Sequence, residues 1–446
     1  MIFTRKIYQK LLEWKKENPK TSALLIEGSR RIGKTTLVEN FAKNEYRNYL
    51  LLDFMYETDA VKSLFNNLDN LDNFFTNLFL IKGKTLKPGD LIIFDEIQAF
   101  PLARQAIKKL VNDARFDFIE TGSLLSIREN VKSITIPSEE SRLNMYPMDF
   151  EEYLWAVGKK DVADLLRNAF DNQRSFPVEI HNLLNLEFRK YLAIGGMPKV
   201  LNEYIEKKDY IKTHKIKNDI CALYKDDLHK HDLKHKTKCE KIWDSLPSVL
   251  RKNNTRFFVS SNINNSRFSQ IEKTLGDIVD SKVVNLVNRL NEPMPGNETL
   301  LSDGMFKLYC CDTGLLLTSI YKDQSNTIQD IYKKVILDKS DTNLGNVYES
   351  AVAQALIANG YKPYYHTYSY CNEGKENNYE IDFMIERMGK IYAIEVKSGK
   401  NFLTKSLDNL KYKYPQIKME RIVVSSKQLK KDSEKLFLPI YMIFCL

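Results

Sequence analysis

Short apolar runs alternate with amphipathic segments in the first third of the chain. Residues 22–28 read SALLIEG, residues 88–98 read PGDLIIFDEIQ and residues 116–123 read FDFIETGS. Each run ends at polar or glycine residues, as buried strands of a parallel sheet do. After the first run, TLVENFAKN at 36–44 has its apolar residues at helical spacing. The pattern predicts an α/β core over residues 1–150, a parallel sheet with helices on both faces.

The segment between the first strand and this helix predicts a phosphate-binding loop. It reads Gly28, Ser29, Arg30, Arg31, Ile32, Gly33, Lys34, Thr35 and Thr36. The strand, glycine-rich loop and helix are the context that a P-loop requires. Gly28 and Gly33 permit tight turns, so that backbone N–H groups and the helix N-terminus face phosphates. Lys34 would reach the β- and γ-phosphates and Thr35 would bind Mg²⁺, which predicts ATP and Mg²⁺ as cofactors.

Two adjacent acids end the second run. Asp95 would hold the water shell of Mg²⁺, and Glu96 would orient and polarise an attacking water, which favours ATP hydrolysis over binding alone. The third run ends before Ser123, which could touch the γ-phosphate from a neighbouring strand, although a plain turn is the alternative. An ordinary metabolic kinase is disfavoured, because the acid pair suits water as the nucleophile.

The order of these motifs resembles one group of prokaryotic AAA-type ATPases that carry a C-terminal domain of uncharacterised function. The resemblance continues through SRLNMYPMDFEEYL at 141–154, YLAIGGMPKVL at 191–201 and MFKLYCCDTGLL at 305–316. It implies a helical lid, which with a basic connector occupies residues 151–238.

Within that resemblance, Gly196 and Pro198 would pack near the adenine of ATP, although a helix-breaking turn is the alternative. Arg142 would act on a nucleotide. Ser141 stands where the family usually has glycine, so Arg115 and Arg128 are kept as alternatives to Arg142.

Residues 239–325 predict a winged-helix domain. Segments 239–253, 268–276 and 282–292 have helical spacing, and residues 292–311 suit a β-wing. The third helix would bury an apolar stripe of Val283, Val284, Val287 and Leu290, and would present DNA-binding residues on its opposite face: Lys282, Asn285 and Arg289. Such modules also bind proteins or their own chain. Nearby residues with metal-ligating side chains fit a solvated basic helix better than a metal site: His229, His231, His235 and Cys239.

Residues 380–397 predict a β-hairpin around a two-residue turn at Met388 and Gly389. Pairing Arg387 with Lys390 places Asp382 opposite Glu395, with Lys397 on the same face, while Ile381 and its alternate neighbours face the core. Opposed carboxylates repel unless a cation lies between them. Glu349 projects from the otherwise apolar face of a helix over 345–360, where an acid needs a partner.

This arrangement resembles the PD-(D/E)XK nuclease superfamily. The resemblance implies a nuclease-like α/β domain over 326–446, with Asp382, Glu395 and Glu349 as ligands of Mg²⁺ or Mn²⁺ and Lys397 positioning the attacking water. A salt-bridged hairpin in a degenerate, binding-only fold is the alternative. A basic-faced helix over 404–415 could lie along a phosphate backbone.

Composition adds an anionic partner to these expectations. The 446 residues carry a formal net charge of +9, which makes DNA a plausible partner. The base composition of the coding DNA would, however, give the same excess of basic residues. Six scattered cysteines suggest neither a disulfide framework nor a zinc ribbon. Without an apolar run of about 18 residues, we expect a cytoplasmic protein with no membrane partner.

The sequence therefore predicts a Mg²⁺-dependent, ATP-hydrolysing AAA-type ATPase that engages DNA, with a nuclease-like domain that could cleave it. The alternative is a nucleotide-gated switch whose inactive nuclease fold binds a protein or DNA. A protein partner and a homo-oligomer are both compatible with the sequence.

Overall fold

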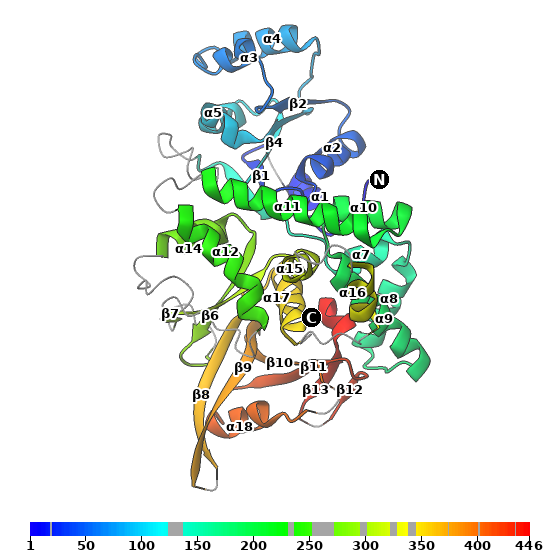
Figure 1. Cartoon of the computed structure of the whole chain (residues 1–446). Helices are drawn as coiled ribbons and strands as arrows, with labels where there is room; N and C mark the ends of the chain where they lie inside the picture. The colour runs from blue at the N-terminus through cyan, green and yellow to red at the C-terminus, as the bar shows by residue number, and fades with distance from the viewer. Residues whose placement is uncertain are drawn as a thin grey trace. The chain divides into compact units, whose positions relative to one another are not determined.

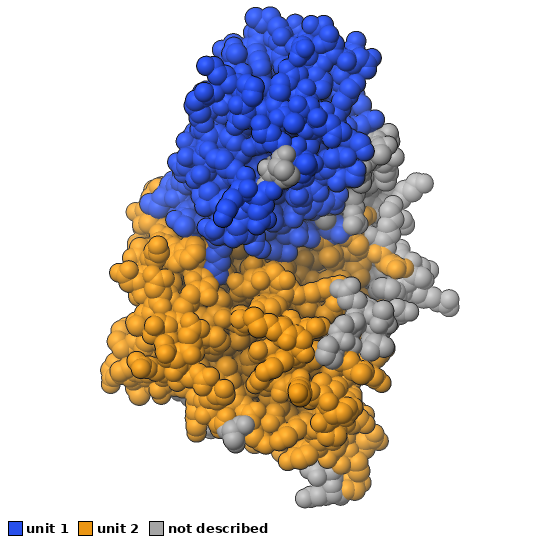
Figure 2. Space-filling model, turned by 180° about the vertical axis from the view of Figure 1, so that it is seen from behind, with its two compact units in different colours: residues 1–146, 280–282 blue, residues 147–279, 283–446 orange. Residues whose placement is uncertain are grey.

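The computed structural model describes the chain in segments that fall into two compact units. Unit 1 comprises residues 1–146 with 280–282, and unit 2 comprises residues 147–279 with 283–446 (Figure 2). The described residues are 1–17, 20–123, 137–230, 236–251, 272–294, 301–321, 328–337, 345–372, 374–399, 402–432 and 434–446.

Unit 1 is built around a five-stranded parallel sheet with the order β2-β3-β4-β1-β5, of which Figure 1 labels β1, β2 and β4. Its strands are β1 (Ala23–Glu27), β2 (Tyr49–Asp53), β3 (Leu91–Asp95), β4 (Asp117–Gly122) and β5 (Glu140–Asn144). Its helices are α1 (Ile7–Glu17), α2 (Lys34–Glu45), α3 (Asp59–Leu64), α4 (Leu71–Lys82), the short η1 (Ile97–Ala99) and α5 (Pro101–Asn112). Because the strands are parallel, the residues that follow β1, β3 and β4 share one edge of the sheet.

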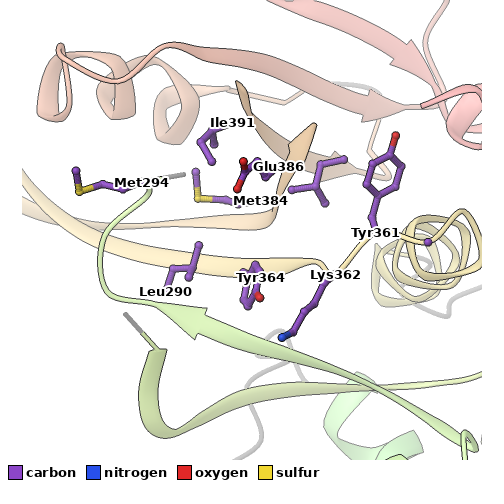
Figure 3. Close-up of a pocket in the computed structure, with 10 residues that line it drawn as sticks. Leu290, Met294, Tyr361, Lys362, Tyr364, Met384, Glu386 and Ile391 are labelled. Atoms are coloured by element: carbon purple, nitrogen blue, oxygen red, sulfur yellow. The ribbon is translucent and has the colours of Figure 1, made fainter. Parts of the chain in front are cut away.

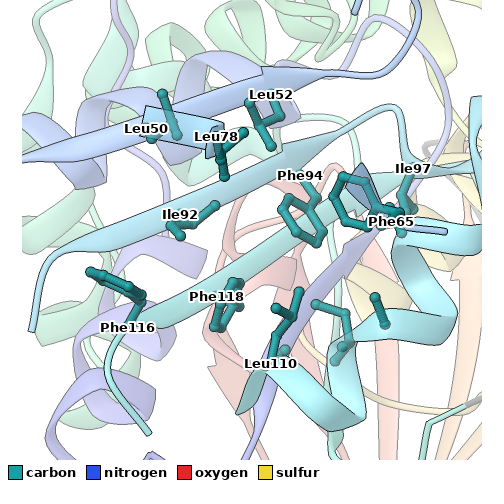
Figure 4. Packing of buried hydrophobic residues seen from close by; sticks show 14 of the residues in the cluster. Leu50, Leu52, Phe65, Leu78, Ile92, Phe94, Ile97, Leu110, Phe116 and Phe118 are labelled. Atoms are coloured by element: carbon teal, nitrogen blue, oxygen red, sulfur yellow. The ribbon is translucent and has the colours of Figure 1, made fainter. Parts of the chain in front are cut away.

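Helices cover both faces of this sheet. On one face, Phe74 and Leu78 of α4 and Leu110 of α5 pack with alternate residues of the strands, such as Phe94 and Phe118 (Figure 4). Helix α2 contacts β3 and β4 but adds no residue to that cluster, so it covers the opposite face. The predicted α/β core with a parallel sheet is confirmed.

Unit 2 contains a mixed eight-stranded sheet with the order β12-β13-β11-β10-β9-β8-β6-β7. Its strands are β6 (Val284–Leu290), β7 (Leu301–Cys310), β8 (Tyr364–Asn372), β9 (Lys375–Arg387), β10 (Lys390–Lys397), β11 (Met419–Ser425), β12 (Lys430–Lys431) and β13 (Leu436–Pro439). Helix α17 contacts β6, β7 and β10, and α18 contacts β9.

The helices of unit 2 are α7 (Phe150–Ala156), α8 (Lys160–Asp171), α9 (Val178–Ile194), α10 (Pro198–Lys207), α11 (Tyr210–Lys230), α12 (Lys236–Arg251), α14 (Glu272–Asp280), α15 (Thr313–Ile320), α16 (Ile328–Ile336), α17 (Gly345–Ala358), α18 (Lys405–Lys413) and the short η5 (Ile440–Cys445). Among them, α17 and α18 correspond to the helices that the sequence predicts over 345–360 and 404–415, whereas α15 and α16 were not predicted.

The helix that we predict over 282–292 is wrong, because residues Val284–Leu290 form strand β6. This strand pairs antiparallel with β7 and parallel with β8. The β-branched valines suit a pleated strand. Val283, Val284 and Asn285 are buried in succession, and a register shift between Asn288 and Leu290 displaces Leu290, so the buried positions imitate helical spacing.

The DNA-binding face predicted for that helix therefore does not exist. Lys282 groups with unit 1 and has a left-handed φ of 60°. Asn285 is buried, and Arg289 contacts Met305. Strand β7 takes the place of the predicted wing, and both strands join the C-terminal sheet, so the boundary predicted at residues 325 and 326 divides one sheet.

Other predictions lie partly or wholly outside the described residues. Arg128, His231 and His235 are among them, as is the side chain of His229 and the start of the helix predicted over 268–276. Cys239 is buried in α12. Within the described segments, no group of three or more His, Cys, Asp or Glu side chains is arranged to hold a metal ion.

Candidate functional site

The glycine-rich loop between β1 and α2 has the tight geometry predicted for phosphate binding. Gly33, which precedes α2, has a left-handed φ of 92°. A Cβ atom on Gly28 would lie 2.4 Å from the backbone oxygen of Met145, so no larger residue fits there. The loop thus needs glycine at both positions.

Lys34 is folded back onto this loop. Its ammonium donates to the backbone oxygens of Gly28 at 2.9 Å and Ser29 at 3.0 Å, and the residue is buried. Because α2 begins at Lys34, the positive charge and the N–H groups of the helix N-terminus lie together. This end of α2 favours an anion.

Asp95 lies beside the loop and accepts two side-chain hydroxyls. Thr35 Oγ1 donates to Asp95 Oδ2 at 2.8 Å, and Thr121 Oγ1 donates to Asp95 Oδ1. Burial raises the pKa of Asp95, and the two hydroxyl donors oppose that shift. The structure brings Thr35 and Asp95 together as predicted.

Thr121 is a site residue that the sequence analysis missed. The β3 and β4 register pairs Phe94 with Glu120, so the next residues along the two strands, Asp95 and Thr121, are neighbours. Aligning the ends of the two apolar runs would have found it.

Glu96 follows β3 at the same edge of the sheet. It has a left-handed φ of 52°, and the Gln98 side-chain amide donates to its carboxylate. A positive φ outside glycine is uncommon and often marks a functional turn. Ser123 is buried just after β4, also at this edge. Its contact with a γ-phosphate stays a prediction.

Arg142 lies on edge strand β5, opposite Leu25 of β1. Its guanidinium is 3.9 Å from Glu27 Oε1 and 3.5 Å from Glu140 Oε2, and its side chain is 45% exposed. Arg115 lies before β4, at the opposite edge of the sheet from the loop, and pairs with Asp72 and Asp113. Arg115 is therefore a poor alternative within one chain.

In unit 2, the element at 191–201 that contains Gly196 and Pro198 contacts the element at 305–316. Gly196 N–H donates to Asp312 Oδ2 at 2.5 Å, and Gly196 O accepts from the N–H of Met148 at 2.8 Å. Added Cβ atoms would lie 1.9 Å from Met148 O at Gly196 and 2.3 Å from Ile194 O at Gly314. Pro198 begins α10. These residues have a packing role here, and their contact with adenine stays a prediction.

The C-terminal hairpin has the turn and the register that the sequence predicts. Met388 and Gly389 have φ values of 51° and 70°, and the ladder pairs Arg387 with Lys390 and continues to Phe383 with Ile394. The positive φ values match the two-residue turn. Beyond this ladder, Asp382 Oδ2 accepts the N–H of Val396 at 2.8 Å.

The strict alternation of faces that we predict for β9 is wrong. Along β8, Tyr364 pairs with Met384 and His366 pairs with Ile381, so two residues of β8 span three of β9. This is a β-bulge next to Asp382. Because of it, Ile381 and Met384 pack in one cluster with Ala393.

Four acids converge beside this bulge, and we call them the carboxylate cluster: Glu349, Glu380, Asp382 and Glu395. Ser406 donates to the carboxylate of Glu395, which also pairs with Lys397. Tyr309 Oη donates to Glu349 Oε2 at 3.0 Å. The structure thus brings together Asp382, Glu395 and Lys397, as the hairpin register predicts, and Glu349, which we predict from the helix over 345–360.

Lys307 of β7 lies inside the cluster and was not predicted as a site residue. Its ammonium is 2.7 Å from Glu380 Oε1, 3.7 Å from Glu349 Oε2 and 3.8 Å from Asp382 Oδ1. The lysine is fully buried, with 0% exposure. The only sequence signal was its place in the MFKLYCCDTGLL element.

The charges in the cluster shift each other's pKa values. Burial and neighbouring Glu349 raise the pKa of Asp382 to about 7, against the opposing effect of Lys307. Burial alone would lower the pKa of Lys307, but Tyr309 and three carboxylates raise it well above its usual value. Lys307 is therefore charged at neutral pH.

The residues present do not fit a Mg²⁺ or Mn²⁺ ion among Glu349, Glu380 and Asp382. Mg²⁺ requires oxygen ligands at about 2.0–2.1 Å in near-octahedral geometry. Here the carboxylates surround an ammonium, and two of them also accept internal donors. Of the three acids predicted as metal ligands, Glu349 and Asp382 lie within 3.8 Å of the Lys307 ammonium and Glu395 pairs with Lys397. The expectation of a metal-loaded nuclease site is not supported by this geometry.

A separate pocket of about 360 Å³ lies in unit 2 (Figure 3). Its lining is mostly apolar and includes Leu290, Met294, Met384 and Ile391, with Lys362 and Glu386 as charged residues. It includes no member of the carboxylate cluster and no residue of the glycine-rich loop.

Comparison with known families identifies three segments of the chain. Residues 20–154 match a family described as an AAA domain, residues 185–326 match a domain of unknown function (DUF8612) and residues 344–443 match another domain of unknown function (DUF4143). The first part of the chain is therefore an AAA-type P-loop ATPase domain. No curated protein matches the chain.

Similar solved structures include a Walker-type ATPase and a branch migration motor. The Walker-type ATPase PABY2304 of Pyrococcus abyssi is 15% identical, with a TM-score of 0.41, over 71% of this chain and 96% of that one. The Thermotoga maritima RuvB Holliday junction branch migration motor is 14% identical, with a TM-score of 0.28, over 61% of this chain and 82% of that one. Among the described residues, no helix is both long and apolar enough to cross a membrane.

Proposed function

We propose that this chain is a Mg²⁺-dependent ATPase and that its C-terminal unit binds nucleic acid. The proposed binding does not require that this unit cleaves the nucleic acid. The observation that carries the ATPase part is the convergence of Lys34, Thr35 and Asp95 at the carboxyl edge of a parallel sheet. Lys34 would bind the phosphates, and Thr35 with Asp95 would hold Mg²⁺, which offsets charge on the transferred phosphate. Glu96 would orient the attacking water.

Steady-state ATP turnover tests this proposal. We expect Lys34→Ala to abolish turnover, because this variant removes the ammonium that lies on the loop carbonyls of Gly28 and Ser29, where the phosphates would bind. Lys43→Ala is the matched control: it lies on the same helix, in an exposed pair with Glu39, and should keep wild-type turnover. Turnover unchanged by Lys34→Ala would remove the proposal.

The nucleic-acid part rests on charge and on α18. This helix exposes Lys405, Lys411 and Lys413 together with Tyr412, a combination that suits phosphates and bases. Its buried Ser406 donates to Glu395, so the basic face is fixed to the sheet beside the carboxylate cluster. The net charge of +9 favours the same partner.

Fluorescence anisotropy with labelled DNA at several salt concentrations tests this part. Replacing Lys405 and Lys413 with Glu should weaken binding and reduce the salt slope by roughly one for each phosphate that the protein no longer neutralises. Lys160→Glu with Lys199→Glu is the control, since both lysines are exposed in unit 2 outside α18. Equal weakening by both pairs would show only a net-charge effect, and no binding by wild type would favour a protein partner.

Metal-dependent cleavage is the competing function for the same domain. Asp382, Glu395 and Lys397 favour it by resemblance, whereas Lys307 in the cluster argues against it. DNA cleavage with Mg²⁺ or Mn²⁺ that disappears in Lys397→Ala would establish a nuclease instead. Contacts of Ser123, Gly196, Pro198 and Arg142 with nucleotide, and a homo-oligomer, stay predictions.

A further inference from the structure

Lys307 reaches the carboxylate cluster from a part of the chain that precedes the hairpin. It lies on β7, where it pairs with Val287 of β6, and β6 pairs in turn with β8. Lys307 therefore lies on the edge strand of the sheet, and its ammonium contacts acids on α17 and β9. A fully buried lysine is rare unless it is paired.

The carboxylates are arranged around this ammonium and around internal donors. Lys307 lies within 3.8 Å of Glu349, Glu380 and Asp382. Glu349 also accepts Tyr309 Oη, and Asp382 also accepts the N–H of Val396. The fourth acid, Glu395, has its own lysine, Lys397, and its own hydroxyl donor, Ser406.

A second cation has no place among the same three acids. A divalent ion would meet an ammonium of like charge in a buried, low-dielectric site, where repulsion is weakly screened. Lys307 is fully buried, so moving its ammonium out of the ion's path would break its ion pairs with the three acids. Among the described residues, no acid group has the arrangement of a metal site.

We propose that Lys307 is the resident cation of the carboxylate cluster and stands where a nuclease of similar fold would hold a divalent metal. Unit 2 thus offsets part of the negative charge of its acids without metal. This inference concerns the cluster alone and rests on neither ATP hydrolysis nor DNA binding, so its failure would leave both of those proposals in place.

The experiment measures Mn²⁺ binding by electron paramagnetic resonance in the full chain, without nucleotide. Asp95→Asn serves as the parent, because it removes the carboxylate of the metal site predicted in unit 1. We expect no stoichiometric Mn²⁺ binding by this parent. Adding Lys307→Met should create a Mn²⁺ site that is lost again when Glu349→Gln is also present, and Mn²⁺ should raise the melting temperature of the Lys307→Met protein.

Lys217→Met is the matched control. Lys217 is also fully buried, but it donates to the neutral partners Ala193 O at 2.6 Å and Tyr332 Oη at 2.8 Å. Its replacement should create no Mn²⁺ site.

Two results would overturn the proposal. One is Mn²⁺ binding by the parent protein that Glu349→Gln removes, which can be measured even if Lys307→Met does not fold. The other is a folded Lys307→Met protein that still binds no Mn²⁺.

Discussion

Gly196 provides a sharp test of how unit 2 is packed. In Gly196→Ala, the new Cβ would lie 1.9 Å from Met148 O and 2.7 Å from Met148 N, both backbone atoms. The backbone must therefore separate, and the hydrogen bonds from Gly196 N–H to Asp312 and from Met148 N–H to Gly196 O are broken or stretched.

The expected cost follows from these contacts. A hydrogen bond to a charged group contributes about 1.5–3 kcal/mol and a neutral one about 0.5–1.5 kcal/mol. Overpacking adds about 1–3 kcal/mol. We expect Gly196→Ala to lower the free energy of unfolding of unit 2 by at least roughly 3 kcal/mol, which at typical slopes moves the urea midpoint by about 1 M or more.

Urea unfolding followed by tryptophan fluorescence measures this change. Trp155 and Trp243 belong to unit 2, so a Trp14→Phe background removes the signal from unit 1. Gly276→Ala is the control, because a Cβ at Gly276 in α14 meets nothing within 4 Å and alanine favours a helix by about 1 kcal/mol. A Gly196→Ala midpoint equal to that of wild type would refute the packing argument.

Three further predictions concern single side chains. Thr121→Val removes one hydroxyl from Asp95, so kcat for ATP should fall roughly tenfold or more and unit 1 should lose about 1.5–3 kcal/mol of stability; an unchanged kcat would contradict a role at the site. Arg104→Met breaks a buried ion pair with Glu140 that contains two hydrogen bonds, and it should destabilise unit 1 by about 3–5 kcal/mol in calorimetry. Lys43→Ala, which removes an exposed pair, should change the stability little in the same measurement. Burial and Lys217 lower the pKa of His214 from 6.5 to about 4, so the unfolded chain binds a proton that the folded chain does not. The stability of unit 2 should therefore fall as pH drops from about 6.5 to 4, and His214→Gln should reduce that fall. If the urea midpoints of wild type and His214→Gln changed equally with pH, this role of His214 would be contradicted.

The sequence predicts well those features that are set by neighbouring residues. The loop from Gly28 to Thr35 is local, and its two glycines meet steric needs that the structure shows. The hairpin register follows from the turn at Met388 and Gly389. Each depends on a few consecutive residues, so pattern and chemistry suffice.

Features set by distant pairing escape the same reasoning. Residues 284–290 match a helical period because a register shift displaces Leu290, and only its partner strands reveal this. The role of Lys307 depends on its contacts with Glu349, Glu380 and Asp382, which are distant from it in the sequence. No local pattern distinguishes it from any lysine in an apolar strand.

The order of strands in unit 2 has a consequence for how its parts can be inherited. One family match ends at residue 326 and the next begins at residue 344. Strands β6 and β7, which lie in the first matched segment, nevertheless complete the sheet of the second. A gene fragment beginning at residue 344 would encode four acids without the lysine that three of them surround, and β8 would lose β6, one of its two neighbours. We therefore expect the two segments to be exchanged between genes only as a pair.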